Sequence, residues 1–536
     1  MARLVRFRIL SAGVAAAVLL MSAPAQAYEE RAMQLPVRAG ALAASASQPA
    51  TWLVGAKRGP ASARIARRFA ARGLKLGTAY RVATPRARAF ADALRRAGRL
   101  TYAEPNIGLQ RASALDALPD AGPRAAVVDP GLVAPAPVPT ASIAVVDDLV
   151  DVSLADLQPN TRQLNPGPIL GPHGTQVASV AAGVLDGSGV FGIFPGAPVL
   201  SVGLPQRITC ADAANAILAA ASARARVINL SFGSPVPCAT LFNAVQGAYA
   251  SGSLVVAASG NEFASGNPVI YPAAYPHVLS VAALDGSLRP SAFSSTNAAV
   301  DIAAPGVGVP VAVPLAFDGD GVVDGVTLVD GTSFSSPIVA GAAALVATAR
   351  PSLNNGQLAD VLRRSARDVG AAGYDASTGF GLVRVPEALS HPTPVRDVLE
   401  PNDGISFVDG SAFGSADPFV WKGTGRRTLR GSVDRVEDPV DVLRIRMPRG
   451  ALLRIRLRPT AGNPDLRVFS ASADSTDDTG RIIARSSRSA RATDSVRFVN
   501  RSSRNRTAYV VVDVSTVTGT ALNATYRLEF QRLKRR

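Results

Sequence analysis

Short apolar runs alternate with segments of helical spacing between residues 141 and 390, and this alternation constrains the fold more than any other feature of the sequence. The apolar runs cover residues 143–146, 199–202, 227–230, 254–258 and 279–283, and helical spacing occurs at 177–184, 211–223 and 239–250. Strands without polar alternation are buried on both faces. The pattern therefore predicts an α/β domain with a parallel sheet, helices on both faces, and functional side chains at the carboxyl ends of the strands.

Four polar residues fall at that predicted edge of the sheet. Asp147 ends the first strand, Asn261 follows the fourth, and His173 lies among small residues before an apolar helix. Ser333 precedes a long uncharged stretch in which Pro337 is expected within the first helical turn, where proline is tolerated. Each residue alone has an ordinary structural explanation: a turn aspartate, a turn asparagine, a structural histidine and an N-capping serine.

Together the four side chains match what acyl transfer requires. A serine hydroxyl is a weak nucleophile until a base removes its proton, and imidazole titrates near neutral pH. A carboxylate orients the imidazole, and an amide donor stabilises the oxyanion that forms. His277 and His391 are expected in a loop and a linker, and Asp148 and Asp151 are expected to be solvated or capping residues.

Six sequence blocks around these residues follow one order: Ala-Val-Val-Asp, His-Gly-Thr-x-Val-Ala, Ile-Asn-Leu-Ser-Phe-Gly, Val-Val-Ala-Ala-Ser-Gly-Asn, Ala-Pro-Gly and Gly-Thr-Ser-x-x-x-Pro. In these blocks the chain resembles the subtilisin-like serine proteases, or subtilases, over residues 141 to about 390. The resemblance implies a catalytic triad of Asp147, His173 and Ser333. It also implies an oxyanion hole formed by Asn261 and the N–H of Ser333, and hence a serine endopeptidase that works through an acyl-enzyme.

The resemblance further implies a cleft in which an extended substrate pairs as an added strand. The residues implied to line it are Ser231, Phe232, Gly233, Ala258, Ser259 and Gly260. The chain departs from the family at Asp148-Leu149, where Thr/Ser-Gly is usual, and this change alters the loop that carries Asp147. The alternative function is therefore an inactive subtilase scaffold that acts as an envelope-binding or adhesion protein.

The first third of the chain carries features of export and maturation. Residues 1–27 have a basic start, an apolar run and an Ala-Gln-Ala cleavage site, which are typical of a secretory signal peptide. Residues 28–113 contain two strand–helix repeats of a small α+β domain and resemble the inhibitor-type propeptide of subtilases. Residues 114–140, rich in alanine and proline, are expected to be a linker that is cut. We therefore expect a zymogen, inhibited by its own propeptide, that is secreted or periplasmic.

The last third of the chain changes character. Residues 391–416 are expected to form a second linker, and residues 417–536 show short runs of period-2 alternation separated by turn residues. This pattern predicts an all-β sandwich. The Glu-Pro-Asn-Asp sequence that precedes it resembles the start of the pre-peptidase C-terminal domains of secreted bacterial proteases.

The net charge of +16 is unevenly distributed. Residues 28–113 carry 16 basic and 4 acidic side chains, whereas residues 139–390 carry 10 basic and 17 acidic ones. Because no nucleic-acid motif accompanies the basic residues, the contrast indicates two domains that attract each other rather than a nucleic-acid-binding protein. The expected partners are polypeptide substrates and the propeptide, and we expect a monomer without a membrane span.

Two cysteines and one acidic segment complete the candidate sites. Cys210 and Cys238 each precede a predicted helix at the carboxyl edge of the sheet, so we expect them to form a disulfide, with two buried thiols as the alternative. Residues 318–324 carry three aspartates but lack the ligand pattern of a calcium loop, and they are interpreted as a hairpin turn. No cofactor is expected for catalysis. The resemblance is compatible with structural calcium, but no metal ligand can be named from the sequence.

Overall fold

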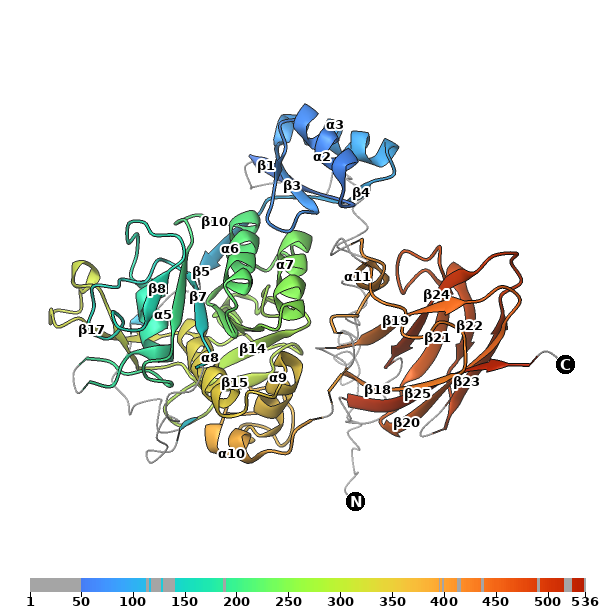
Figure 1. The fold of residues 1–536 in the computed structure, drawn as a ribbon. Coiled ribbons are helices and arrows are strands. Elements are labelled where there is room, and N and C mark those ends of the chain that lie inside the picture. The colour runs from blue at the N-terminus through green and yellow to red at the C-terminus, as the bar shows by residue number, and fades with distance from the viewer. Residues whose placement is uncertain are drawn as a thin grey trace, which may run out of the picture.

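The fold was analysed in a computed structural model (Figure 1). The structure describes residues 50–111, 115–116, 127–128, 140–186, 189–394, 396–397, 400–411, 416–434, 438–488, 492–514 and 523–534. The predicted signal peptide and most of the predicted linker at 114–140 lie outside the described residues. Three bodies are visible: a small N-terminal one, a central α/β body and a C-terminal β body.

The N-terminal body is an antiparallel sheet covered on one face by two helices. Its elements are β1 (Thr51–Ala56), α2 (Pro60–Arg68), β2 (Arg72–Gly73), β3 (Ala79–Ala83), α3 (Thr84–Arg96) and β4 (Leu100–Pro105), in the sheet order β2-β3-β1-β4. Both helices have a proline near the N-terminus, where it costs no hydrogen bond. Phe90 and Leu94 bury the inner face of α3 against Val54. The small α+β domain predicted from the sequence is thus present.

The central body contains a seven-stranded sheet in the order β15-β14-β13-β11-β7-β9-β8, with every pair parallel. Its strands are β7 (Ile143–Asp147), β8 (Thr161–Gln163), β9 (Val199–Gly203), β11 (Val227–Leu230), β13 (Leu254–Ala258), β14 (Val278–Leu284) and β15 (Ile302–Pro305). The flanking helices are α5 (His173–Ala182), α6 (Cys210–Ser222), α7 (Ala239–Ala250), α8 (Thr332–Ala349), α9 (Asn355–Arg364) and α10 (Val385–Ser390).

Helices cover both faces of this sheet, as predicted. Ile143 and Val145 of β7 belong to the core cluster that contains α5 and α8, whereas Ala144 and Val146 belong to the cluster that contains α6 and α7. Alternate residues of one strand therefore pack against opposite layers, because successive side chains of a strand point to opposite faces. This explains why the strands lack polar alternation. The edge strand β8 was missed because its sequence, Thr-Arg-Gln, is polar.

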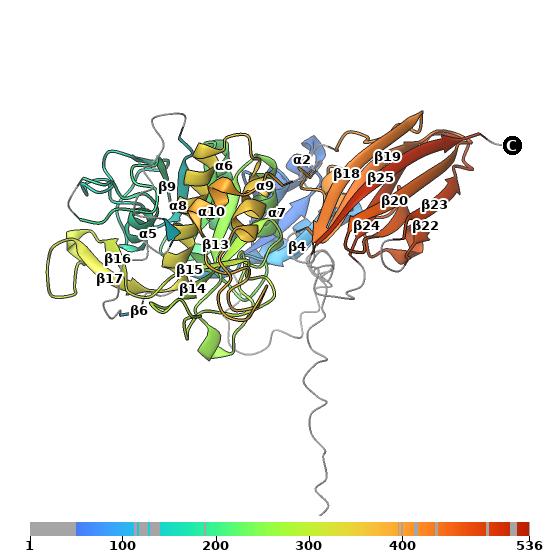
Figure 2. The ribbon, with the colours of Figure 1, turned by 90° about the horizontal axis from the view of Figure 1, so that it is seen from below.

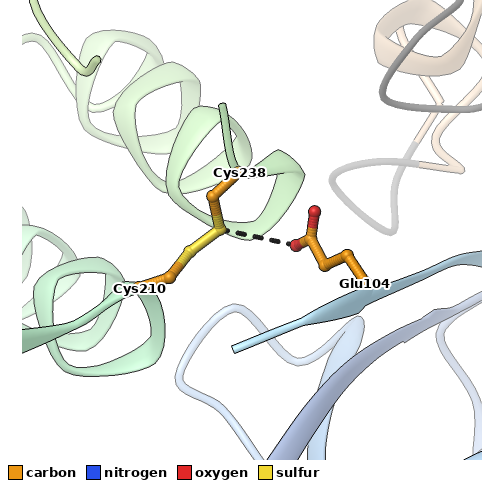
Figure 3. A group of neighbouring side chains, drawn as sticks. All are labelled: Glu104, Cys210 and Cys238. Carbon is orange, nitrogen blue, oxygen red and sulfur yellow. Dashed lines mark hydrogen bonds between the residues drawn. A yellow bond between two sulfur atoms is a disulfide. The ribbon is translucent and has the colours of Figure 1, made fainter. Parts of the chain in front are cut away.

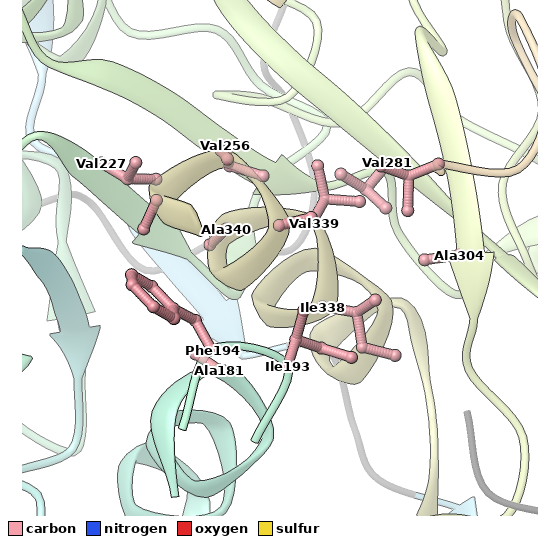
Figure 4. Close-up of a cluster of buried hydrophobic side chains, with 14 of the residues drawn as sticks. Ala181, Ile193, Phe194, Val227, Val256, Val281, Ala304, Ile338, Val339 and Ala340 are labelled. Carbon is pink, nitrogen blue, oxygen red and sulfur yellow. The ribbon is translucent and has the colours of Figure 1, made fainter. Parts of the chain in front are cut away.

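Helix α8 lies in the core between the sheet and α5 (Figure 4). Val339 faces β-strand residues such as Val281, while Ile338, on the other side of the helix, lies next to Ile193. A Cβ on Gly341 would lie 2.8 Å from the Ala181 carbonyl oxygen, so only glycine allows the two helices this approach. The helix is long and apolar enough to span a membrane, but 94% of it is buried within the protein.

Two small sheets lie outside the main one. The first has the order β10-β5-β12, from β10 (Ile208–Thr209), β5 (Gly108–Arg111) and β12 (Phe232–Gly233). The second has the order β16-β17-β6, from β16 (Val309–Ala312), β17 (Val326–Asp330) and β6 (Leu115–Asp116). Residues 318–324 connect the antiparallel strands β16 and β17, in agreement with the predicted hairpin. β6 falls within the predicted linker at 114–140, which is therefore not wholly without strand structure.

The C-terminal body is a β sandwich with the sheet orders β18-β25-β20-β23 and β19-β24-β21-β22 (Figure 2). Its strands are β18 (Arg426–Asp434), β19 (Val440–Met447), β20 (Leu452–Ala461), β21 (Asp465–Ser470), β22 (Ile482–Ser486), β23 (Asp494–Val499), β24 (Arg506–Asp513) and β25 (Asn523–Leu533). The predicted linker at 391–416 is more structured than expected. It contains α11 (Ile405–Val408), whose Ile405 and Val408 are buried against the sandwich.

Candidate active site

Asp147 and His173 lie in contact at the carboxyl edge of the sheet. Asp147 is the last residue of β7 and is fully buried, and His173 is the first residue of α5. The His173 Nδ1 atom is 2.9 Å from each carboxylate oxygen of Asp147. Such a contact fixes the orientation of the ring and directs Nε2 away from the carboxylate. His173 Nε2 is buried and has no hydrogen-bond partner among the described residues.

Ser333 is the second residue of α8 and is completely buried. The following residue, Phe334, packs its ring 5.7 Å from the His173 ring, centroid to centroid, so the start of α8 and the start of α5 are neighbours. Ser333 therefore lies where the sequence predicted it, at a helix N-terminus with unbonded N–H groups and a positive dipole end.

The prediction that Pro337 lies in the first turn of this helix is wrong. Pro337 is the sixth residue of α8, well inside the helix. Because proline has no N–H, it cannot donate to the carbonyl four residues before it, which is that of Ser333. The Ser231 hydroxyl donates to this carbonyl instead, at 2.9 Å. The Ser333 hydroxyl in turn lies 3.4 Å from the Ser231 carbonyl oxygen.

A buried hydrogen-bond network extends from this contact into the sheet. Ser336 donates from Oγ to Asn229 Oδ1 at 2.6 Å, and Asn229 Nδ2 donates to Ser231 Oγ at 3.0 Å. Asn229, Ser231 and Ser336 are fully buried. The network fixes the start of α8 to the end of β11. Sequence reasoning missed Asn229 and Ser336, although a polar residue inside the otherwise apolar strand at 227–230 was a usable signal.

Asn261 lies against the first residue of α8. Its Oδ1 atom accepts hydrogen bonds from Thr332 N at 3.0 Å and Thr332 Oγ1 at 2.8 Å. These two bonds identify the oxygen side of the amide, so Nδ2 points the other way as a donor. Gly331, which precedes Thr332, has φ 144°, a conformation that favours glycine. The structure thus brings the predicted oxyanion donor to the same helix end as Ser333.

The predicted cleft residues flank a strand of the chain itself. β5 lies between β10 and β12, pairing Arg111 with Phe232 and Leu109 with Ile208, both antiparallel. Phe232 and Gly233 were predicted to line the cleft. The strand β10, on the other side of β5, was not predicted, because a strand of two residues shows no periodicity in the sequence. Ala258, Ser259 and Gly260 follow at the end of β13.

The unusual Asp148-Leu149 pair is accommodated by neighbouring glycines. A Cβ on Gly203 would lie 2.5 Å from Leu149 Cγ, and a Cβ on Gly174 would lie 1.9 Å from the Asp148 carbonyl oxygen. Asp148 was expected to be solvated or to cap a loop. It is not solvated, because it is only 4% exposed. Asp151 does cap a turn, accepting from Ser153 N at 2.9 Å. The altered loop therefore keeps Asp147 in contact with His173.

The N-terminal body docks onto the central one through Glu104 (Figure 3). The Glu104 carboxylate accepts hydrogen bonds from Ala239 N at 2.8 Å and Thr240 N at 2.9 Å, at the N-terminus of α7. Burial raises the pKa of Glu104 above its usual value, and these backbone bonds oppose the rise. The predicted disulfide between Cys210 and Cys238 is present beside it, joining the starts of α6 and α7.

A second cluster of titratable groups lies where the central body meets the C-terminal one. His277 Nε2 is 3.3 Å from Glu400 Oε2, and His277 Nδ1 is 3.5 Å from Asp403 Oδ2. Further carboxylates come from the range 391–416 and from the sandwich. The acidic members are Asp397, Glu400, Asp403, Asp438 and Asp441. We call these residues and His277 the junction cluster.

The junction cluster brings five carboxylates together around one histidine. Burial raises the pKa of Asp403 to about 7 and places the pKa of Glu400 well above its usual value. Asp403 is only 7% exposed, yet neither of its oxygens has a hydrogen-bond partner among the described residues. Several carboxylate oxygens that converge in this way are the ligands preferred by calcium. The junction cluster is thus the strongest candidate for a metal site in the described chain, and no pattern in the sequence predicted it.

Comparison with known proteins identifies the family of the central body. The Subtilase family matches residues 139–381. Subtilisin BL of Lederbergia lenta is 38% identical over 219 residues, which cover 40% of this chain and 77% of subtilisin BL. Subtilisin E of Bacillus subtilis (strain 168) is 34% identical over 259 residues, which cover 46% of this chain and 65% of subtilisin E.

A solved structure extends the likeness in fold beyond the central body. Fervidolysin from Fervidobacterium pennivorans, a keratinolytic enzyme related to subtilisin, has a TM-score of 0.57 at 18% sequence identity. The match covers 91% of this chain and 93% of fervidolysin. The central fold, the sequence identity to the subtilisins and the family match together show that this chain belongs to the subtilase family and is a serine endopeptidase.

Proposed function

We propose that the protein hydrolyses polypeptides with a triad of Asp147, His173 and Ser333, and that it is an exported enzyme made as a zymogen. The observation that carries the triad is the 2.9 Å contact of His173 Nδ1 with Asp147, which leaves Nε2 available at the start of α8, where Ser333 lies. A general base must be within reach of the hydroxyl it activates, and this reach commonly tightens only when substrate binds.

In the proposed reaction His173 Nε2 accepts the proton of the Ser333 hydroxyl as its oxygen attacks the peptide carbonyl. Asp147 stabilises the imidazolium that results. Asn261 Nδ2 and the Ser333 N–H donate to the oxyanion. The peptide C–N bond then breaks as His173 protonates the leaving amine. His173 then deprotonates a water molecule, whose oxygen attacks the acyl carbonyl. The ester bond to Ser333 breaks as His173 returns the proton to the serine oxygen.

The position of β5 supports the zymogen. This strand lies in the implied substrate cleft between β10 and β12, and β6 pairs with β17, the strand that precedes α8. β6 lies opposite Val329 and Asp330, and Asp330 is three residues before Ser333 in the sequence. The two described strands that flank residues 112–114 thus pair with a predicted cleft wall and with the strand before Ser333, and this supports a cut between them. We propose that self-cleavage occurs at one of the bonds between Arg111 and Leu115, which frees the N-terminal body as a docked inhibitor.

Two further elements of the proposal rest on other observations. The signal-like sequence at 1–27 and the disulfide support export to an oxidising compartment, either the periplasm or the medium. The junction cluster supports a structural calcium ion, which would neutralise buried carboxylates at the boundary of the two bodies. Such an ion would stabilise the fold and take no part in peptide hydrolysis.

A fluorophosphonate probe that labels activated serines tests the triad. Wild-type mature protein should be labelled, and Ser333→Ala and His173→Ala should not. An inactive scaffold of the adhesion type would instead leave the wild type unlabelled, and the proposed function would fail.

The masses of the chain ends test the zymogen. Wild-type protein expressed alone should start between residues 112 and 115, whereas Ser333→Ala protein should keep its N-terminal body covalently attached. Normal maturation of Ser333→Ala expressed alone would show that another protease makes the cut.

A further inference from the structure

Ile270 fills the space between the two predicted walls of the cleft. A Cβ built on Gly233, in the first wall, would lie 2.3 Å from Ile270 Cγ2. A Cβ built on Gly260, in the second wall, would lie 2.7 Å from Ile270 Cγ1. The Ile270 side chain therefore contacts both glycines, and Ile270 is only 5% exposed.

The surroundings of Ile270 hold it in this position. The next residue, Tyr271, forms a pair of backbone hydrogen bonds with Ser234, at 2.8 and 2.9 Å, which joins the Ile270 loop to the first wall. On the second wall, Glu262 Oε2 would lie 2.4 Å from a Cβ on Gly260. The Glu262 carboxylate accepts a hydrogen bond from Ser295 Oγ at 3.3 Å. The space between the two cleft walls is thus bounded by the Ile270 side chain and by the Glu262 carboxylate, and hydrogen bonds hold both in place.

The register of β5 shows which substrate residue meets this space. Gln110 pairs with Gly233 and Arg111 pairs with Phe232. A peptide bound in the same register places its next residue opposite Ser231, the residue that contacts Ser333. This substrate residue, opposite Ser231, carries the carbonyl that is attacked. Its side chain falls between the two cleft walls, in the space that Ile270 fills. This residue is the P1 residue, on the amino side of the cut bond.

We propose that Ile270 closes the bottom of the P1 pocket and restricts the enzyme to cleavage after small residues such as alanine, serine and glycine. This inference rests on the proposed function, since it assigns the specificity of the same site. A hydrophobic pocket rejects side chains that it has no volume for, because the side chain or the wall must move to admit them.

The sequence of the chain at its own proposed cut fits this restriction. The residue that follows Arg111 is Ala112, and Ser113 and Ala114 come next. Every residue between the end of β5 and the start of β6 is small. A pocket that excludes large side chains would accept this segment as its first substrate.

Two peptide substrates that differ only at P1, alanine against phenylalanine, test the inference in wild-type mature enzyme. We expect kcat/KM for the alanine peptide to exceed that for the phenylalanine peptide by about 10- to 200-fold. In Ile270→Gly the phenylalanine peptide should gain at least about tenfold while the alanine peptide changes little. Val269→Ala, at the exposed neighbouring position, is the matched control and should leave the ratio unchanged.

A second test uses the full-length chain and needs no added substrate. Ala112→Phe should block or shift self-cleavage in the wild-type background, and the double variant Ile270→Gly/Ala112→Phe should restore it. Melting temperatures of Ile270→Gly and the milder Ile270→Ala show whether the fold survives the substitution.

The outcomes separate the two proposals. Wild-type enzyme that cleaves both peptides equally well, or an Ile270→Gly ratio equal to that of wild type, overturns the assignment of Ile270 and leaves the triad intact. Wild-type enzyme that cleaves neither peptide and takes up no fluorophosphonate overturns the proposed function, and the P1 assignment falls with it.

Discussion

The Ser231 hydroxyl donates a 2.9 Å hydrogen bond to the carbonyl oxygen of Ser333. This carbonyl lacks the N–H that an α-helix supplies four positions later, because that residue is Pro337. Pro337 thus leaves the carbonyl of Ser333, the proposed nucleophile, without its usual helical donor. Ser231, which follows β11, supplies a hydrogen bond in its place. The backbone of Ser333 is thereby fixed from the sheet rather than by its own helix.

Ser231→Ala should lower both stability and turnover. The variant removes the hydroxyl that donates to the buried Ser333 carbonyl, which costs about 1–3 kcal/mol of the free energy of unfolding. We expect kcat to fall by about tenfold, since each 1.4 kcal/mol of lost positioning in the transition state is a factor of ten. Urea unfolding and steady-state kinetics measure the two effects. Ser222→Ala removes an exposed hydroxyl that also donates to a backbone carbonyl, and it is the control. A stability loss with unchanged kcat would contradict the positioning role.

Asn261→Ala should lower kcat by about 10²–10³-fold with little change in KM, because its amide is proposed to donate to the oxyanion that exists only during the reaction. Thr332→Val is the informative control. It removes one of the two donors to the Asn261 oxygen but leaves the amide in place, so its loss should be smaller. Equal losses in the two variants would indicate that Asn261 acts by holding Thr332.

Docking of the cut N-terminal body should weaken as pH rises. Burial raises the pKa of Glu104 in the docked state, so that state binds its proton more tightly than the free propeptide does. The contribution to docking is then fully present below the ordinary glutamate pKa and is lost as pH rises through the raised value. The flanking Tyr102 and Tyr275 also have raised pKa values and stay neutral over this range.

Inhibition of mature enzyme by its propeptide, measured from about pH 4 to about pH 8, checks this sign. Glu104→Gln should flatten the pH dependence. Inhibition that strengthens with pH in wild type, or an equal slope in Glu104→Gln, would mean that another group controls docking.

Chelation should destabilise the protein. Calcium at about 1 mM should raise the melting temperature by about 3–10 °C over protein treated with chelator, because it binds only the folded junction cluster. Asp403→Asn should reduce this difference, and in the presence of chelator it should not destabilise, because it removes a buried carboxylate that accepts no hydrogen bond from the described residues and whose pKa burial raises to about 7. Asp474→Asn, at an exposed position of the same body, is the control. Equal calcium shifts in all three proteins would place the ion elsewhere.

Much of the fold could be predicted because the apolar patterns are local. The buried strands of the sheet and the helices between them appear as runs and spacings within a few residues of sequence, and the strands of the sandwich alternate visibly. β8 and β10 could not be found, since a polar or two-residue strand is defined by its neighbours and has no pattern of its own.

The candidate site divides in the same way. Asp147, His173, Asn261 and Ser333 stand at element ends, which the sequence marks. The junction cluster could not be predicted, because His277, Asp403 and Asp441 are distant in sequence and lie in bodies that meet only in three dimensions. The position of Pro337 within its helix was predicted wrongly. A proline inside the helix is tolerated here because Ser231, about one hundred residues earlier in the chain, donates to the Ser333 carbonyl.

If the N-terminal body and β5 are released as proposed, β10 and β12 are left facing each other across the place of one strand. A peptide that fills this gap must present unbonded N–H and C=O groups along both of its edges. A strand inside a folded sheet has already given those groups to its neighbours, so it cannot enter, whatever its side chains. The enzyme should therefore spare native domains, its own included, and cut chains that are unfolded or frayed. Damaged proteins would thus be selected by the availability of their backbone.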